Sequence, residues 1–211
     1  MQLIGMLDSP YVRRVAISLQ LLGLPFEHRS ISVFSTFEQF RQINPVVKAP
    51  SLVCDDGMVL MDSTLILEYL EGLAGPGRSL MPAGTPERQH ALRCIGLALA
   101  ACEKSIQIVY ERNLRPPEKL HQPWVFRVTG QLLAAYNALE FEFGRKSSVA
   151  GTPINQAGVT TAVAWHFTQM MLPEVVSASG FPALRQFSEK AEQLREFVAA
   201  PHGSSTYNDA S

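Results

Sequence analysis

Three short stretches of the sequence place side chains that could bind an anion or activate a nucleophile at the start of a helix or strand. They are "DSPYVRRVAIS" (8–18), "NPVVKAPSLV" (44–53) and "MDSTLILEYLE" (61–71). A hydroxyl and the free amides of a first helical turn can both donate hydrogen bonds to an anion. A lysine can anchor such a ligand at a second point, and a carboxylate can hold an ammonium group. The three stretches therefore contain the groups that a zwitterionic ligand would need.

Ser9 lies directly before an apolar run with helical spacing, and Pro10 takes the first helical position, where a missing N–H costs nothing. Capping of the helix by the Ser9 side chain would explain this arrangement by itself. A hydroxyl aimed at a bound nucleophile would explain it equally well. A serine protease is disfavoured because no GxSxG surrounds Ser9 and nothing singles out a His–Asp pair.

The other two stretches also have structural explanations. Lys48 could anchor an anion or lie solvated at the surface, and the second role is commoner for lysine. The bond between Ala49 and Pro50 precedes a strand, where proline is compatible with an edge or a turn. Asp62 and Ser63 open a helix, and capping alone would account for them. Each stretch taken singly leaves the choice open.

The first 75 residues alternate between strand and helix patterns in the order β-α-β-α-β-β-α. Gly23 is expected to end the first helix in a left-handed conformation, and Asp55-Asp56-Gly57 indicates a hairpin turn. Ser35 and Glu38 have the spacing of a capping box for the second helix. The predicted elements are strand 3–7, helix 10–22, strand 26–32, helix 35–43, strands 51–54 and 58–61, and a helix from Ser63.

Proline and glycine in "GPGRSLMPAGTP" (75–86) break any regular element, which places a domain boundary there. The remainder has helical patterns over 87–114, 123–143, 155–171 and 181–199. The polar tail 203–211 is expected to be frayed. The prediction is a first domain over 1–75, a linker over 76–86 and an all-helical domain over 87–211.

Taken together, the order strand, Ser-Pro-Tyr, helix, then Asn-Pro-x-x-Lys-Ala-Pro, hairpin and Asp-Ser at a helix start resembles the glutathione-binding domain of glutathione S-transferases. The helical remainder resembles their second domain, and a serine at the first helix resembles bacterial members. In the second domain, "INQAGVTTAVAW" (154–165) resembles the family's buried capping segment, with Asn155 in place of the usual Ser/Thr cap and Gly158 where an aspartate is normal. The resemblance implies a fold of the α/β + α class: a thioredoxin-like first domain followed by an all-α helical bundle.

The resemblance also implies roles for particular residues. Ser9 matches the catalytic hydroxyl that stabilises the glutathione thiolate. The remaining matches are to glutathione-binding positions: Lys48 to the glycyl carboxylate, Ala49 to the cysteinyl backbone, Pro50 to a cis-proline, and Asp62 with Ser63 to the γ-glutamyl end. The hydrophobic electrophile is expected between the domains, near Met6, Leu7, Tyr11 and Tyr110.

The implied function is a glutathione transferase of the detoxification type, which needs no cofactor or metal beyond glutathione as co-substrate. Isomerase or dehalogenase chemistry at the same site is a variant of this function. The alternative is a non-catalytic protein-interaction or stress-response module of the same fold. Related redox proteins carry a cysteine at the position of Ser9, so dithiol chemistry is disfavoured, and Cys54 is expected in the core.

Bulk properties restrict the partners. The chain has 211 residues, 46% hydrophobic and 18% charged, with a net charge of −1. This balance gives no electrostatic reason to expect nucleic acid or an anionic membrane surface as a partner. Three cysteines without metal-ligand spacing are typical of reduced thiols, which together with the absence of a signal-peptide pattern predicts a cytoplasmic protein. A homodimer is expected from the family resemblance alone.

Overall fold

The computed structural model of the chain describes residues 1–145 and 153–207, which form two compact units. The first unit combines Met1–Leu80 with the C-terminal residues from Gln193 onward, and the second is Met81–Glu192. Leu80, where the first segment of the first unit ends, lies within the predicted domain boundary at 75–86. The C-terminal residues were predicted to belong to the helical domain, and the structure groups them with the first unit instead.

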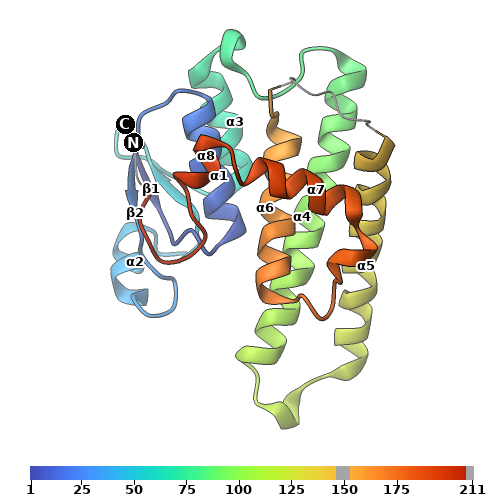
Figure 1. Cartoon of the computed structure of the whole chain (residues 1–211). Coiled ribbons are helices and arrows are strands. Elements are labelled where there is room, and N and C mark those ends of the chain that lie inside the picture. Colours follow the sequence, from blue (N-terminus) through green and yellow to red (C-terminus); the bar gives the residue numbers. More distant parts are fainter. Residues whose placement is uncertain (146–152, 208–211) are drawn as a thin grey trace. The chain divides into compact units, whose positions relative to one another are not determined.

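A four-stranded mixed sheet forms the centre of the first unit (Figure 1). Its strands are β1 (Gln2–Ile4), β2 (Glu27–Arg29), β3 (Ser51–Val53) and β4 (Val59–Leu60), in the spatial order β2-β1-β3-β4. β1 runs parallel to β2 and antiparallel to β3, and β3 pairs antiparallel with β4. The predicted hairpin at Gly57 is confirmed, because Gly57 has a φ of 86° between β3 and β4.

Helices cover both faces of this sheet. α1 (Pro10–Leu21) and α3 (Ser63–Ala74) pack against each other. Ile4 of β1 forms a buried cluster with Phe40 of α2 (Phe37–Ile43). Because successive strand residues point to opposite faces, the fully buried Leu3 faces away from α2. The predicted β-α-β-α-β-β-α order and the thioredoxin-like fold are confirmed.

The second unit is helical throughout its described residues. It consists of α4 (Thr85–Asn113), α5 (Gln122–Arg145), α6 (Gln156–Met171), α7 (Pro182–Ala191) and the short 3₁₀ turns Pro117–Lys119 and Ala178–Gly180. α4 packs against α5 and α6, and α7 contacts both α5 and α6. The buried Tyr136 hydroxyl donates to the Ala164 carbonyl at 2.9 Å, which ties α5 to α6. None of the described helices has the length and apolar character needed to cross a membrane.

The helix caps test the sequence predictions directly. Asn155 caps α6 as predicted, because its Oδ1 accepts from the Gly158 amide at 3.0 Å. The capping box predicted from Ser35 is wrong: α2 has Thr36 at its N-cap, without a side-chain cap bond. The Thr36 hydroxyl instead accepts from the Ser32 amide at 2.8 Å and donates to the Ser32 carbonyl at 3.0 Å. The N-cap thus lies one residue later than predicted, and its hydroxyl forms a local turn instead of capping the helix.

The C-terminal residues of the first unit include the four-residue helix α8 (Arg195–Val198), which packs against α1. The Arg13 Nε–H donates to the Ala200 carbonyl at 2.8 Å, and Gln20 Nε2 donates to the Glu196 carbonyl at 2.9 Å. Arg13 is only 2% exposed. A buried guanidinium needs such carbonyl partners, and this requirement explains why the segment lies against α1 rather than in the helical unit.

Candidate functional site

Ser9 lies at the N-cap of α1, half-buried, with its oxygen accepting from the Val12 amide. The N···O distance is 3.5 Å, at the outer limit of a hydrogen bond, so the cap is weak. The Ser9 amide in turn donates to the Met6 carbonyl at 3.2 Å, which closes a turn between β1 and α1. Because capping uses a lone pair of the hydroxyl, its O–H proton can still be donated to an anion at the helix N-terminus.

The loop from Asn44 to Ser51 presents Lys48 and Ala49. The Ala49–Pro50 bond is cis, and Val47 adopts a φ of 53°, which is a strained value for a β-branched residue. Asn44, 5% exposed, donates from Nδ2 to the Ser51 hydroxyl at 2.8 Å. The Ser51 hydroxyl donates to the Lys48 carbonyl at 2.8 Å. These bonds hold the loop so that Lys48 is exposed, as an anion anchor would have to be.

Asp62 is the N-cap of α3, and its Oδ1 accepts from the amides of Thr64 and Leu65 at 3.0 and 3.4 Å. Both bonds go to Oδ1, and Oδ2 is available to accept from an ammonium group. Ser63 takes the first helical position and is 2% exposed. The helix start thus combines a carboxylate, a hydroxyl and the amides of a first turn.

Arg14 connects the Ser63 region to α1 and was not singled out from the sequence. It is 2% exposed, and its Nη1 donates to the hydroxyls of Ser63 and Thr64 at 3.2 and 3.4 Å. This places a buried cation directly behind the start of α3. The signal in the sequence was weak, because two consecutive arginines in an amphipathic helix usually indicate its solvated face.

The three stretches meet in the first unit. Gly5 precedes the Ser9 turn, and a Cβ atom built on it would lie 2.6 Å from Val12 Cγ2 and 3.1 Å from the Ala49 Cβ. The turn that leads to Ser9 therefore lies against Ala49. Asn44 also contacts Met61 Sδ at 3.2 Å, one residue before Asp62. Residues predicted to bind glutathione from all three stretches belong to one compact unit.

The pKa of Asp8, immediately before Ser9, is raised from its usual value. Partial burial raises its pKa, and the nearby His202 and the amides of Ser9 and Asp8 oppose this shift. His202 belongs to the C-terminal segment that follows α8. A residue from the end of the chain thus influences the electrostatics next to Ser9.

The predicted electrophile residues are divided between the two units. Met6 and Tyr11 are half-buried in the first unit, and Tyr110 is 44% exposed on α4 of the second. Leu7 is fully buried, which is typical of a core residue and does not fit a direct contact with an electrophile. Cys54 is buried, as predicted. The described residues contain no group of three His, Cys, Asp or Glu side chains that could hold a metal.

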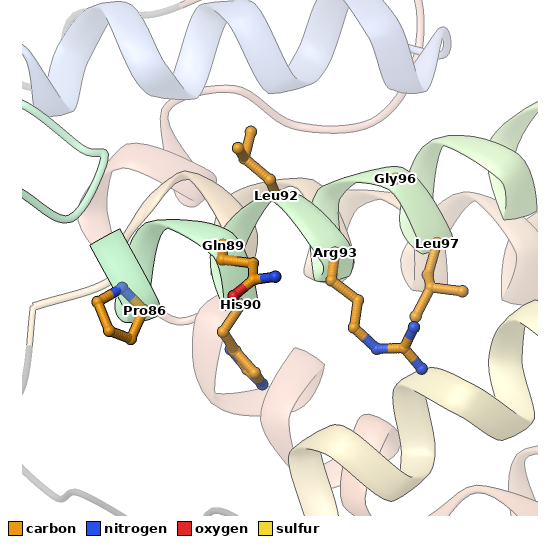
Figure 2. Close-up of a pocket in the computed structure, with 7 residues that line it drawn as sticks. All are labelled: Pro86, Gln89, His90, Leu92, Arg93, Gly96 and Leu97. Carbon is orange, nitrogen blue, oxygen red and sulfur yellow. The ribbon is translucent and has the colours of Figure 1, made fainter. Parts of the chain in front are cut away.

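An open hollow lies along the first half of α4 in the second unit (Figure 2), with the apolar Pro86, Leu92 and Leu97 and the polar His90 and Arg93 in its lining. His90 Nε2 and Arg93 Nε contact Glu142 of α5 at 3.0 and 2.9 Å. The Arg93 bond, followed by that of His90, lowers the pKa of the Glu142 carboxyl. The hollow contains none of the residues predicted to bind glutathione.

Comparison with known proteins points to one family. Residues 3–79 match the family described as Glutathione S-transferase, N-terminal domain. The uncharacterized GST-like protein YibF of Escherichia coli is 27% identical over 140 residues, 66% of this chain and 68% of that protein. A probable maleylacetoacetate isomerase of Caenorhabditis elegans is 36% identical over 90 residues, but the chain spans only 41% of its length.

Solved structures extend the similarity to nearly the whole chain. A glutathione transferase family member from Pseudomonas fluorescens with bound glutathione has a TM-score of 0.79 at 25% identity, covering 94% of this chain and 97% of that one. A glutathione S-transferase from Methylobacterium radiotolerans, in complex with glutathione sulfonate, has a TM-score of 0.86 at 24% identity, covering 100% and 98%, and shows the shared fold. Residues 3–79 are thus a glutathione S-transferase N-terminal domain, and the chain as a whole, with its thioredoxin-like first unit and helical second unit, is similar to glutathione S-transferases.

Proposed function

We propose that the first unit binds glutathione and that Ser9 stabilises its thiolate for attack on a small hydrophobic electrophile. The observation that carries this proposal is the arrangement of Ser9, the loop that presents Lys48 and Ala49, and the Asp62–Ser63 helix start within one compact unit. The glutathione bound to the Pseudomonas fluorescens relative supports the choice of ligand.

The charges of glutathione fit these groups. Its γ-glutamyl end carries an ammonium group, from which Asp62 Oδ2 can accept a hydrogen bond. The same end carries a carboxylate, to which the Ser63 hydroxyl and the first amides of α3 can donate hydrogen bonds. Arg14, donating to Ser63, adds a buried positive charge behind that carboxylate. Lys48, exposed in its loop, can pair with the glycyl carboxylate. The Ala49 backbone can then pair with the cysteinyl residue between the two ends.

The thiol of glutathione would lie at the N-terminus of α1. A thiol reacts as the thiolate, so an environment that lowers its pKa raises the reactive fraction. Lowering that pKa by about two units corresponds to roughly 2.7 kcal/mol of preferential thiolate binding. The Ser9 O–H and the positive end of the helix dipole both act in this direction. The thiolate sulfur then forms a C–S bond with the electrophile, and the leaving group departs or a proton is added to the product.

Binding and activation can be measured together by calorimetry and by ultraviolet titration of the bound thiolate. Asp62→Asn keeps the N-cap, because asparagine caps as well as aspartate, but removes the negative charge. We expect glutathione affinity to fall about tenfold to a hundredfold, as for a lost hydrogen bond to a charged group. Glu68→Gln, an exposed charge change on the same helix, is the control and should bind like the wild type.

The outcomes separate the proposed enzyme from the alternative module. Binding with a thiol pKa well below that of free glutathione supports the enzyme. Binding with an unshifted thiol pKa favours a non-catalytic protein-interaction or stress-response module. Failure of the wild type to bind glutathione would contradict both the ligand and the reaction.

We also infer that the chain forms a homodimer. Leu65, Tyr69 and Leu73 of α3 are 63%, 38% and 49% exposed and lie four residues apart, so they share one helical face. An exposed apolar row of this kind is typical of an interaction surface. Leu65→Glu is expected to convert a dimer to monomers in sedimentation velocity. Met170→Glu, at an exposed apolar position of α6, is the control; a wild type that sediments as a monomer would contradict the inference.

A further inference from the structure

The C-terminal segment Ala199–Tyr207 is attached to the sheet side of the first unit at several points (Figure 1). The Ser30 hydroxyl donates to the Ser204 carbonyl at 2.7 Å. The Tyr207 ring stacks on Phe26 with centroids 4.7 Å apart. The sequence predicted a frayed tail from residue 203, and this prediction is wrong for residues 203–207; residues 208–211 lie outside the described chain. The small and polar side chains of this segment do not indicate that it docks, because most of its contacts are hydrogen bonds of its backbone.

His28 of β2 links this segment to the turn before Ser9. The His28 ring, 8% exposed, contacts the Gly5 carbonyl through Nε2 at 2.7 Å and accepts from the Tyr207 amide through Nδ1 at 2.9 Å. A carbonyl can only accept and an amide N–H can only donate. The two contacts therefore require one state of the ring: neutral, with its proton on Nε2.

Gly5 is where β1 ends and the turn to Ser9 begins. Its amide donates to the Arg29 carbonyl at 3.1 Å. Residues of β2 therefore bond to both the amide and the carbonyl of Gly5. The C-terminal segment reaches the same turn a second time, because His202 acts electrostatically on Asp8, the residue before Ser9. Both ends of the Gly5–Ser9 turn are thus in reach of the segment.

We propose that His28 is a positioning residue for Ser9, and that the segment Ala199–Tyr207, docked on neutral His28, holds the Gly5–Ser9 turn in its active geometry. This inference rests on the proposed role of Ser9. When His28 takes up a proton, Nδ1 carries an N–H that faces the Tyr207 N–H, and that hydrogen bond is lost. The docking of the segment is then coupled to pH.

The titratable groups on the surrounding elements are Asp8 on the turn, Arg13 on α1, His202 and Tyr207 on the segment itself, and Glu27 and Arg29 beside His28 on β2. Burial lowers the pKa of His28, and the Gly5 carbonyl opposes this shift. A folded-state pKa below the unfolded value favours the neutral ring. The resulting stability is present above the unfolded pKa of about 6.5 and is lost as pH falls through the folded value.

Two variants of His28 separate positioning from titration. In His28→Gln, the side-chain amide supplies one donor for Gly5 and one acceptor for Tyr207 but cannot take up a proton in this range. His28→Ala removes both bonds. Thermal unfolding checks that each variant is folded, and the conservative glutamine variant keeps the test valid if the alanine variant is not.

The first measurement is the protection of the Tyr207 amide from hydrogen exchange, followed by NMR and corrected for the intrinsic rate at each pH. In the wild type, we expect protection above about pH 7 and its loss on acidification, with a midpoint below about pH 6.5. His28→Gln should stay protected through the same range, and His28→Ala should be unprotected throughout. Equal protection in all three proteins, or the same pH profile in wild type and His28→Gln, would overturn the docking.

The second measurement is the thiol pKa of bound glutathione. We expect His28→Ala to raise it by about one unit and to lower kcat about tenfold, with KM for glutathione within about twofold of wild type. His28→Gln should restore both values. A lowered thiol pKa in the wild type that His28→Ala leaves unchanged would overturn the positioning role. A wild type that does not lower the thiol pKa, while Tyr207 protection still follows His28, would instead contradict the proposed function.

Discussion

Ser9→Ala is expected to lower the rate of conjugation about tenfold to a hundredfold, which corresponds to losing one to two units of the shift in the thiol pKa while the helix dipole remains. Glutathione affinity should change much less, because the proposed site binds the charged ends of the ligand at Lys48, Asp62 and Ser63. The loss should appear in kcat rather than KM, since the Ser9 hydroxyl is proposed to interact with the sulfur and not with the ends of the ligand. Steady-state kinetics with ultraviolet titration of the bound thiolate measures both quantities.

Capping and catalysis at Ser9 can be separated by matched variants. Asparagine caps a helix about as well as serine but carries no hydroxyl, so Ser9→Asn should keep stability and lose activity. Ser9→Thr keeps both the hydroxyl and the cap, and should retain much of the activity. If Ser9→Asn were as active as the wild type, the hydroxyl would have no role in the reaction.

The helix starts were the most predictable part of the site. Ser9, Asp62 and Asn155 each precede an apolar helical run, and each caps its helix in the structure. N-capping depends on the residue type at one position and on its nearest neighbours, so it can be read locally. The two caps in the first unit also place three of the predicted glutathione residues, Ser9, Asp62 and Ser63, at the starts of α1 and α3.

Features that depend on distant residues could not be read in this way. The role of Arg14 depends on a hydrogen bond from its Nη1 to the Ser63 hydroxyl, 49 residues away in the sequence. His28 and Tyr207 are separated by 179 residues, and the Tyr207 contribution is a backbone N–H that every residue except proline possesses. The Ser35 prediction failed for the opposite reason, because a competing local bond of Thr36 to Ser32 changed the helix start.

Substitution of Gly5 is expected to have a large effect on the stability of the first unit. Its φ of 135° is a conformation that residues with a Cβ rarely adopt. A methyl group there would also meet Val12 Cγ2 at 2.6 Å, inside the contact distance of carbon atoms. Backbone strain and overpacking each cost about 1–3 kcal/mol, so Gly5→Ala should lower the free energy of unfolding by about 2–6 kcal/mol.

The same substitution should also affect the ligand site, because Gly5 begins the turn to Ser9 and lies against Ala49. The methyl group would approach Ala49 at 3.1 Å, and any shift of the backbone would move the carbonyl that His28 contacts. Denaturant unfolding and glutathione calorimetry should therefore both show a loss. Gly130→Ala is the control: an added Cβ there meets open space on α5, and helix propensity predicts a gain of about 0.5–1 kcal/mol. A Gly5→Ala protein as stable as wild type would mean that Val12 and the turn can move apart, and that the approach of β1 to α1 does not depend on glycine.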